Sequence, residues 1–223
     1  MSTLGIIPAA GKGDRWGGYF KEMLPIKPKK WLINNAVTSM SLAKANPIMI
    51  VTSLEKIPIH ANHFKNEENI IFSLQNNNFQ NDIYGAVLEG LKFPAGLNFL
   101  AMPDTIFPVD CFRKNFSSFD LWLGCFKTNM PTRFGIVKND RIYDKYSSFV
   151  DGLTYYDAWG VVVWSDKVAN FWKKEKEIET FSFALTLAMK KFGYKVFPLD
   201  YYYDMASWKD YEDYISSNVG KTI

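Results

Sequence analysis

The first half of this chain alternates between two apolar periodicities. Four short apolar runs have the length and flanking turn residues of buried strands: Thr3–Pro8, Pro47–Thr52, Asn69–Leu74 and Leu97–Met102. Between them lie segments with helical apolar spacing: Trp31–Leu42, a polar stretch that ends near Phe64, and Asp82–Leu91. Strands that alternate with helices favour right-handed βαβ crossovers, so we predict an α/β fold with a mainly parallel sheet.

The second half has shorter apolar segments joined by turns. The expected strands are Asp120–Cys125, Phe134–Val137, Arg141–Tyr143, Trp159–Trp164 and Lys195–Pro198. The expected helices are Lys167–Trp172, Thr180–Lys191 and Ser207–Ile215. Because no linker, low-complexity tract or internal repeat interrupts the sequence, we predict one domain over residues 1–223, with a Rossmann-like half at 1–110 and a mixed half at 111–223.

Composition narrows the functional classes. A chain of 223 residues with 48% hydrophobic content can bury a continuous core, and its net charge of +3 is too small to predict nucleic-acid binding. No apolar run is long enough to span a bilayer, and the N-terminus has no secretion-signal pattern. Cys111 and Cys125 lie in apolar surroundings that suit reduced core thiols. We therefore expect a cytoplasmic protein without a nucleic-acid or membrane partner, and homo-oligomerisation stays open.

Two smaller clusters are expected to be structural. Lys27, Lys29 and Lys30 form the densest basic group, which is typical of the solvated start of a helix. His60 and His63 are expected to be surface residues of a helix, because no cysteine or acid nearby completes a zinc-binding set.

The segment after the first strand combines glycines with two cations. Gly11 and Gly13 are followed by Arg15, and Lys21 comes just before Leu24-Pro25. Glycines let backbone N–H groups approach an anion closely, because no Cβ intervenes. A loop at the carboxyl end of a strand also faces the ligand crevice of an open α/β sheet. We expect this loop to bind a polyphosphate, although neither the dinucleotide fingerprint nor the P-loop spacing fits it; the alternative for the glycines alone is a plain turn.

Two aspartates are candidate metal ligands. Asp104 follows the predicted strand that ends at Met102, and Asp204 follows a run of three tyrosines. Mg²⁺ prefers hard oxygen ligands and often takes one or two protein carboxylates. The alternatives are a turn or helix-capping aspartate at position 104 and a strand-end aspartate at position 204, before a helix capped by Ser207.

Together these motifs resemble the sugar-1-phosphate nucleotidylyltransferases, a family with a GT-A-like fold that includes the UTP- and dTTP-dependent enzymes acting on glucose 1-phosphate. The matching residues are Ala9, Ala10, Gly11, Gly13, Arg15, Lys21, Leu24, Pro25, Asp104 and Asp204. The resemblance implies a transfer from an NTP to a sugar 1-phosphate that gives an NDP-sugar and pyrophosphate, with a nucleotide-binding half at 1–110 and a sugar-binding half at 111–223.

The resemblance also implies a role for each of these residues. Arg15 would hold the β- and γ-phosphates, and Lys21 would stabilise charge at the α-phosphorus. Asp104 and Asp204 would hold Mg²⁺. The loop residues Ala9, Ala10, Gly11 and Gly13 would contact the nucleotide.

The remaining likenesses concern the sugar and the base. Arg133-Phe134-Gly135-Ile136-Val137 is similar to the family's Arg-Tyr-Gly-Val-Val strand, and the resemblance assigns four residues to the sugar phosphate: Gly135, Asp144, Lys145 and Gly160. Gln75 and Asp82 correspond to positions that contact the nucleotide. The alternatives are an ordinary edge strand with an exposed lysine, and a polar loop in which Asn81 or Asp82 caps a helix.

Three other functions stay open. A cytidylyltransferase acting on a polyol or isoprenoid phosphate shares the first loop, and the short spacing between Arg15 and Lys21 favours the enzymes of isoprenoid synthesis, but the segment around Asp204 argues against this alternative. A glycosyltransferase normally has an Asp-x-Asp pair, whereas Thr105 and Ile106 follow Asp104. A non-catalytic sensor could bind the nucleotide without turning it over. The sequence specifies neither the sugar nor the base.

Overall fold

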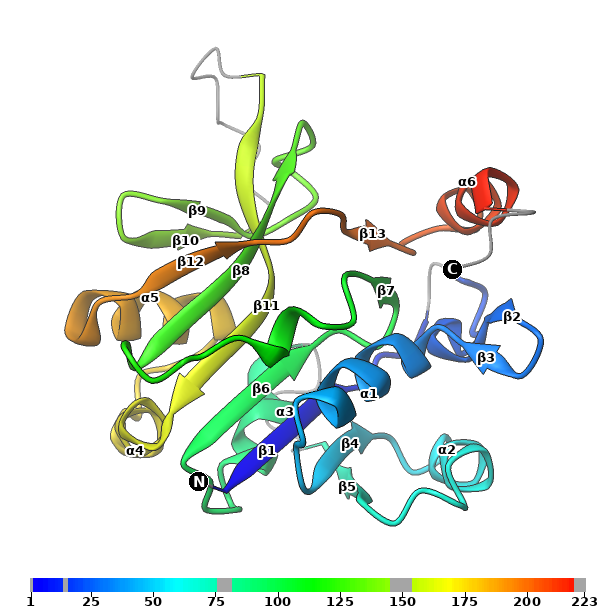
Figure 1. Ribbon diagram of the computed structural model, residues 1–223, viewed down its shortest axis with the longest axis horizontal. Coiled ribbons are helices and arrows are strands. Elements are labelled where there is room, and N and C mark those ends of the chain that lie inside the picture. Colours follow the sequence, from blue (N-terminus) through cyan, green and yellow to red (C-terminus); the bar gives the residue numbers. More distant parts are fainter. Residues whose placement is uncertain (1, 14–15, 76–81, 145–153, 219–223) are drawn as a thin grey trace.

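The computed structural model describes residues 2–13, 16–75, 82–144 and 154–218. Its centre is a nine-stranded sheet with the order β10-β9-β11-β6-β1-β4-β5 along its main path, while β8 pairs with β11 and β12 with β8 (Figure 1). These strands are β1 (Thr3–Pro8), β4 (Ile48–Thr52), β5 (Ile70–Leu74), β6 (Leu97–Ala101), β8 (Leu121–Thr128), β9 (Ile136–Lys138), β10 (Arg141–Tyr143), β11 (Tyr156–Ser165) and β12 (Lys195–Pro198).

The sheet is parallel in its first half and mixed in its second. Strand β1 pairs in parallel with both β4 and β6, and β4 pairs in parallel with β5. Strand β11 runs antiparallel to its neighbours β6, β8 and β9. This arrangement confirms the predicted α/β fold, and it brings the carboxyl ends of β1 and β6 side by side.

Helices cover both faces of the sheet. Neighbouring residues of a strand point to opposite faces, so Ile6 and Ile7 belong to different core clusters. Helix α1 (Ile33–Leu42) packs on the face of Ile7. Helices α3 (Ile83–Gly90), α4 (Asp166–Lys174) and α5 (Phe181–Phe192) pack on the face of Ile6. Helix α2 (Ile57–His63) lies toward the β5 side, and the chain ends with α6 (Trp208–Asn218) on the upper right of Figure 1. No helix in these described ranges is long and apolar enough to cross a membrane.

Two small sheets lie outside the main one. Strands β2 (Pro25–Lys27) and β3 (Lys30–Trp31) form an antiparallel hairpin, and Lys29 has a positive φ of 62° in its turn. The prediction that this basic group starts a helix was therefore wrong, because the chain turns before α1 begins at Ile33. The second small sheet pairs β7 (Thr105–Ile106) with β13 (Tyr203–Asp204).

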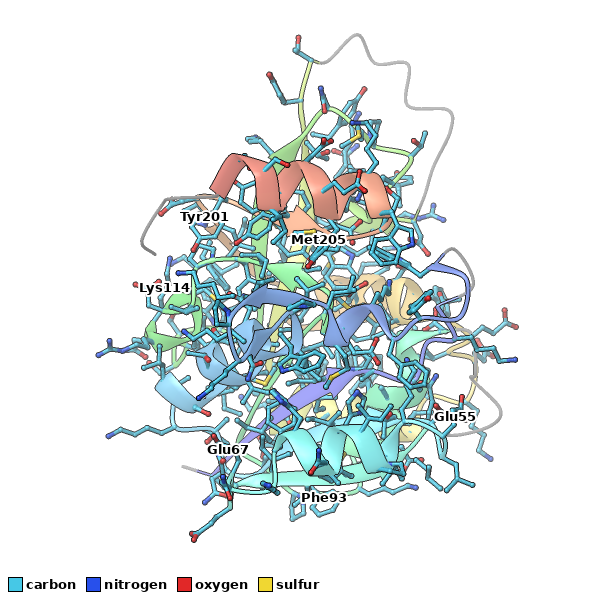
Figure 2. The ribbon with its side chains drawn as sticks, turned by 90° about the vertical axis from the view of Figure 1, so that its right-hand side faces the viewer. Glu55, Glu67, Phe93, Lys114, Tyr201 and Met205 are labelled. Carbon is cyan, nitrogen blue, oxygen red and sulfur yellow. The ribbon has the colours of Figure 1, made fainter. Side chains whose placement is uncertain are left out.

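A small apolar cluster attaches α6 to the rest of the protein. Met205 is buried with Trp16, Leu32, Ile106 and Tyr214, and Figure 2 shows it directly beneath α6. Because Trp16 follows the glycine loop and Ile106 belongs to β7, this cluster joins the C-terminal segment to the first half. Elsewhere in the core, Cys111 and Cys125 are buried free thiols, as predicted.

Candidate active site

A cleft of about 400 Å³ opens at the carboxyl ends of β1 and β6. Several residues predicted for the site line it: Gly11, Gly13, Lys21, Asp104, Gly135, Asp144 and Asp204. Other predicted residues lie elsewhere in the described part of the chain and are not among its lining: Ala9, Ala10, Gln75, Asp82 and Gly160. Arg15 and Lys145 fall outside the described residues. The cleft therefore gathers residues from both halves of the chain.

The two aspartates reach the cleft through the pairing of β7 with β13. Asp204 lies opposite Thr105 in this antiparallel ladder, so it is next to Asp104 although a hundred residues separate the two in sequence. The backbone N–H of Met205 also donates to the carbonyl of Asp104 at 3.1 Å. This short ladder is the structural cause of their proximity.

Lys21 forms an ion pair with Asp104. It begins the short 3₁₀ turn Lys21–Met23, and Asp104 is only 4% exposed. Burial alone would lower the pKa of Lys21, but the negative charge and hydrogen bond of Asp104 raise that pKa above its ordinary value. The ammonium group is therefore held protonated at the floor of the cleft.

Arg133 neutralises the second aspartate. Its Nε lies 2.9 Å from Asp204 Oδ2 and its Nη1 lies 2.9 Å from Asp210 Oδ1, while Nη2 donates to the Asp204 carbonyl at 2.6 Å. Ser207 caps α6, as predicted, because its hydroxyl accepts from the Asp210 N–H at 3.2 Å. Burial and the charge of Asp104 raise the pKa of Asp204, and Arg133 opposes that rise. Arg133 was part of a predicted motif, but no local pattern predicted its contacts with Asp204 and Asp210.

The donor set of the cleft fits Mg²⁺. Asp104 and Asp204 supply carboxylate oxygens to one cavity, and each carboxylate has a cationic partner, Lys21 or Arg133. No group of three or more His, Cys, Asp or Glu side chains that could hold a metal occurs in the described ranges. Mg²⁺ commonly uses one or two carboxylates together with waters and substrate phosphates. These two aspartates therefore suit a magnesium ion that arrives with a nucleotide.

Three glycines of the predicted site are required by backbone geometry or packing. Gly13 has φ +67°, a conformation that favours glycine. A Cβ on Gly135 would lie 2.2 Å from Trp159 Nε1. Gly160 lies at an irregularity in the pairing of β11 with β8, and a Cβ there would lie 2.5 Å from the Tyr202 ring. Their presence is thus explained without a ligand, and their roles toward a sugar stay predictions.

Asp82 has a capping role in this structure. Its carboxylate accepts from the Tyr84 N–H at 2.7 Å, at the start of α3, and from the Phe181 N–H at 2.9 Å, at the start of α5. Gln75 donates to the Asp82 carbonyl at 3.1 Å. The capping alternative is confirmed for Asp82, and contact of Gln75 or Asp82 with a nucleotide stays a prediction.

A buried charged cluster lies beneath the glycine loop. Lys56 is 1% exposed, and its Nζ lies 2.8 Å from Glu22 Oε1. His60 is also fully buried, and its Nε2 lies 3.4 Å from the same oxygen, so the prediction of a surface histidine was wrong. Burial alone would raise the pKa of Glu22, but His60 and Lys56 lower it below its ordinary value. Sequence reasoning missed this cluster, because a lysine just before a short polar helix and a histidine within it resemble surface residues.

No protein-family model matches the chain, and no curated protein matches it in sequence. Solved structures nevertheless share its fold. A Bacillus anthracis protein assigned as a glucose-1-phosphate thymidylyltransferase, crystallised with sucrose, is 17% identical with a TM-score of 0.82, and the match covers 100% of this chain and 97% of that one. The inositol-1-phosphate CTP transferase of T. maritima is 18% identical with a TM-score of 0.71, over 100% and 98% of the two chains.

A UDP-glucose pyrophosphorylase of Acinetobacter baumannii is 15% identical with a TM-score of 0.77, over 98% of this chain and 93% of that one. These neighbours are sugar-phosphate nucleotidyltransferases. At such low identities the likeness establishes the fold, and it confirms the fold implied by the predicted resemblance.

Proposed function

We propose that this protein is a magnesium-dependent nucleotidylyltransferase that joins an NTP to a sugar 1-phosphate and releases pyrophosphate. The main support is that Lys21, Asp104 and Asp204 line one cleft at the carboxyl ends of β1 and β6. The ligand crevice of open α/β sheets lies at this edge. The fold shared with sugar-phosphate nucleotidyltransferases supports the same activity.

The sugar phosphate is already an oxyanion, so the reaction needs no general base. Catalysis would come from alignment of the two phosphates and from stabilisation of charge, as in phosphoryl transfer generally. Lys21 would leave Asp104 and donate to the α-phosphate as charge develops there. Arg15 would hold the leaving pyrophosphate, and Lys145 the sugar phosphate.

Asp104 and Asp204 would hold the metal. Bound Mg²⁺ would neutralise phosphate charge next to the reacting phosphorus. In this structure Lys21 and Arg133 form ion pairs with the same two carboxylates. Phosphate oxygens of a nucleotide would be alternative partners for Lys21 and Arg133, and Asp104 and Asp204 would then be available to hold the metal.

The experiment is pyrophosphate release from a panel of NTPs and sugar 1-phosphates with Mg²⁺. We expect release with at least one pair, and none when the sugar phosphate is omitted. An Asp104→Asn variant that folds normally should lose most of the turnover. If no pair gives release although a nucleotide binds, the protein is a sensor and the proposed reaction is wrong.

A second function is supported by one comparison. The inositol-1-phosphate CTP transferase shares the fold over the whole of this chain, and, as its name states, that enzyme uses CTP and inositol 1-phosphate, a polyol phosphate. The same panel therefore includes CTP with polyol phosphates. Release with CTP and a polyol phosphate alone would favour this cytidylyltransferase reaction.

A further inference from the structure

Lys56 is a buried charge to which the proposed reaction gives no role. An ammonium group has three N–H donors, and here each has an acceptor: the carbonyls of Ala9 at 3.1 Å and Gly11 at 2.5 Å, and Glu22 Oε1 at 2.8 Å. All three acceptors belong to the segment between the end of β1 and Glu22, the residue that follows Lys21. Lys56 therefore joins the beginning of the glycine loop to its end.

This contact also sets the orientation of the loop amides. In a planar trans peptide the C=O and N–H groups point in opposite directions. Because the carbonyls of Ala9 and Gly11 point at Lys56, the N–H groups of Ala10 and Lys12 point away from it. Neither N–H has a hydrogen-bond partner within the described ranges. Ala10 and Lys12 are not among the lining residues of the cleft, but Gly11 between them is, so the two free donors flank a lining residue of the cleft in the way an anion-binding turn requires.

The bond from Lys56 to Glu22 holds the backbone next to Lys21 in place. Glu22 is 2% exposed and adjoins Lys21 in the 3₁₀ turn, so its bond to Lys56 fixes the backbone from which the Lys21 side chain extends. His60 lies 3.4 Å from Glu22 Oε1 and closes the cluster from α2. The Phe20 ring covers the ammonium group at 5.0 Å.

We propose that Lys56 is a positioning residue for the cleft: it orients the loop amides toward a pyrophosphate group and fixes the position of Lys21, without touching substrate itself. This inference rests on the proposed function for its kinetic consequences. Its structural part concerns the loop and an anion, and it can be tested whether or not the protein turns over a nucleotide.

The test uses a double variant, because Lys56→Met alone leaves the Glu22 carboxylate buried without its cation. Lys56→Met with Glu22→Gln removes both charges and keeps the size of the side chains. The matched control is Lys92→Met with Glu89→Gln, which removes another Lys–Glu pair, at 2.5 Å, away from the cleft.

The first measurement is calorimetric affinity for inorganic pyrophosphate with Mg²⁺, a probe independent of base and sugar. We expect the double variant to bind about 10- to 100-fold more weakly, which corresponds to the loss of one charge-assisted hydrogen bond. In turnover, kcat should fall about 10²-fold, the effect of a misplacement of about 1 Å, while KM for the sugar phosphate stays near the wild-type value. Wild-type affinity in the double variant, or an equal loss in the control pair, would overturn the proposal.

A crystal structure of the wild-type protein with magnesium pyrophosphate tests the proposal without any variant. Phosphate oxygens should accept from the N–H of Ala10 or Lys12 while Lys56 stays on both carbonyls. Pyrophosphate bound elsewhere would contradict the inference. If the wild-type protein releases no pyrophosphate from any substrate pair, the proposed reaction fails, and the affinity and the crystal structure still decide the role of Lys56.

Discussion

Replacement of Lys21 by methionine should separate catalysis from stability. The change removes the cation that pairs with Asp104 but keeps most of the side-chain volume. Loss of one charge-stabilising donor typically lowers turnover by about 10²–10³, or about 2.7–4 kcal/mol of transition-state stabilisation. The ion pair is buried on the Asp104 side only, since Lys21 is 29% exposed. We therefore expect a loss of about 1–3 kcal/mol in unfolding free energy, between the values for exposed and fully buried pairs.

Steady-state pyrophosphate release measures the first effect, and urea denaturation measures the second. Lys209→Met is the control, because Lys209 also forms an ion pair, with Asp213, but on the surface of α6. The control should keep the turnover and the stability of the wild type. If Lys21→Met retained wild-type kcat while it lost stability, Lys21 would be a structural residue, and its proposed role at the α-phosphate would be wrong.

Three further outcomes follow from the structure. Lys56→Met alone should lose about 3–5 kcal/mol of unfolding free energy at neutral pH, because Glu22 is left as an unpaired buried charge. In the wild type the lowered pKa of Glu22 stabilises the fold above the ordinary carboxyl pKa, and that contribution disappears as the pH falls through the lower folded value. In the variant, burial without a cation raises the pKa of Glu22, so the carboxyl takes up a proton at a higher pH and the gap in urea stability should narrow as the pH falls from neutral toward the ordinary carboxyl pKa; a constant gap would contradict this reasoning. Gly135→Ala should cost about 1–3 kcal/mol, since the new Cβ would lie 2.2 Å from Trp159 Nε1, and an unchanged Tm would show that the indole moves aside freely. Chelation of Mg²⁺ by EDTA should abolish pyrophosphate release yet leave Tm unchanged, because both carboxylates of the cleft already have cationic partners; a large fall in Tm would indicate a structural metal.

Long apolar segments made most of the fold predictable. Strands β1, β10 and β12 were predicted with their observed bounds, and most other elements differ by a few residues at their ends. Strands β1 and β4 are almost wholly buried, so the apolar runs that predict them are strong signals. The hairpin of β2 and β3 was missed, because it is short, rich in lysine and almost without alternation.

Site residues could be predicted from the sequence only where they belong to a short local motif of chemically suitable residues. Asp104 and Lys21 belong to local motifs, and the structure brings both to the cleft. The contact of Arg133 with Asp204 joins residues 71 positions apart, and no local pattern predicts such an ion pair. Lys56 was missed for the same reason, because its three acceptors lie 34 to 47 residues before it. Partners of buried charges are fixed by the tertiary fold, which periodicity alone does not reveal.

The short ladder of β7 and β13 holds Asp104 and Asp204 next to each other in the cleft, and packing around it stabilises this arrangement. Two residues per strand give few hydrogen bonds, and an isolated ladder of this size has little stability in water. Here Met205 continues the ladder into the buried cluster with Trp16 and Ile106. Trp16 in turn follows the loop whose ends Lys56 holds. The glycine loop, Asp104 and Asp204 are therefore connected through packing as well as through charge, so a change in the Met205 cluster would disturb the acidic and the cationic sides of the cleft together.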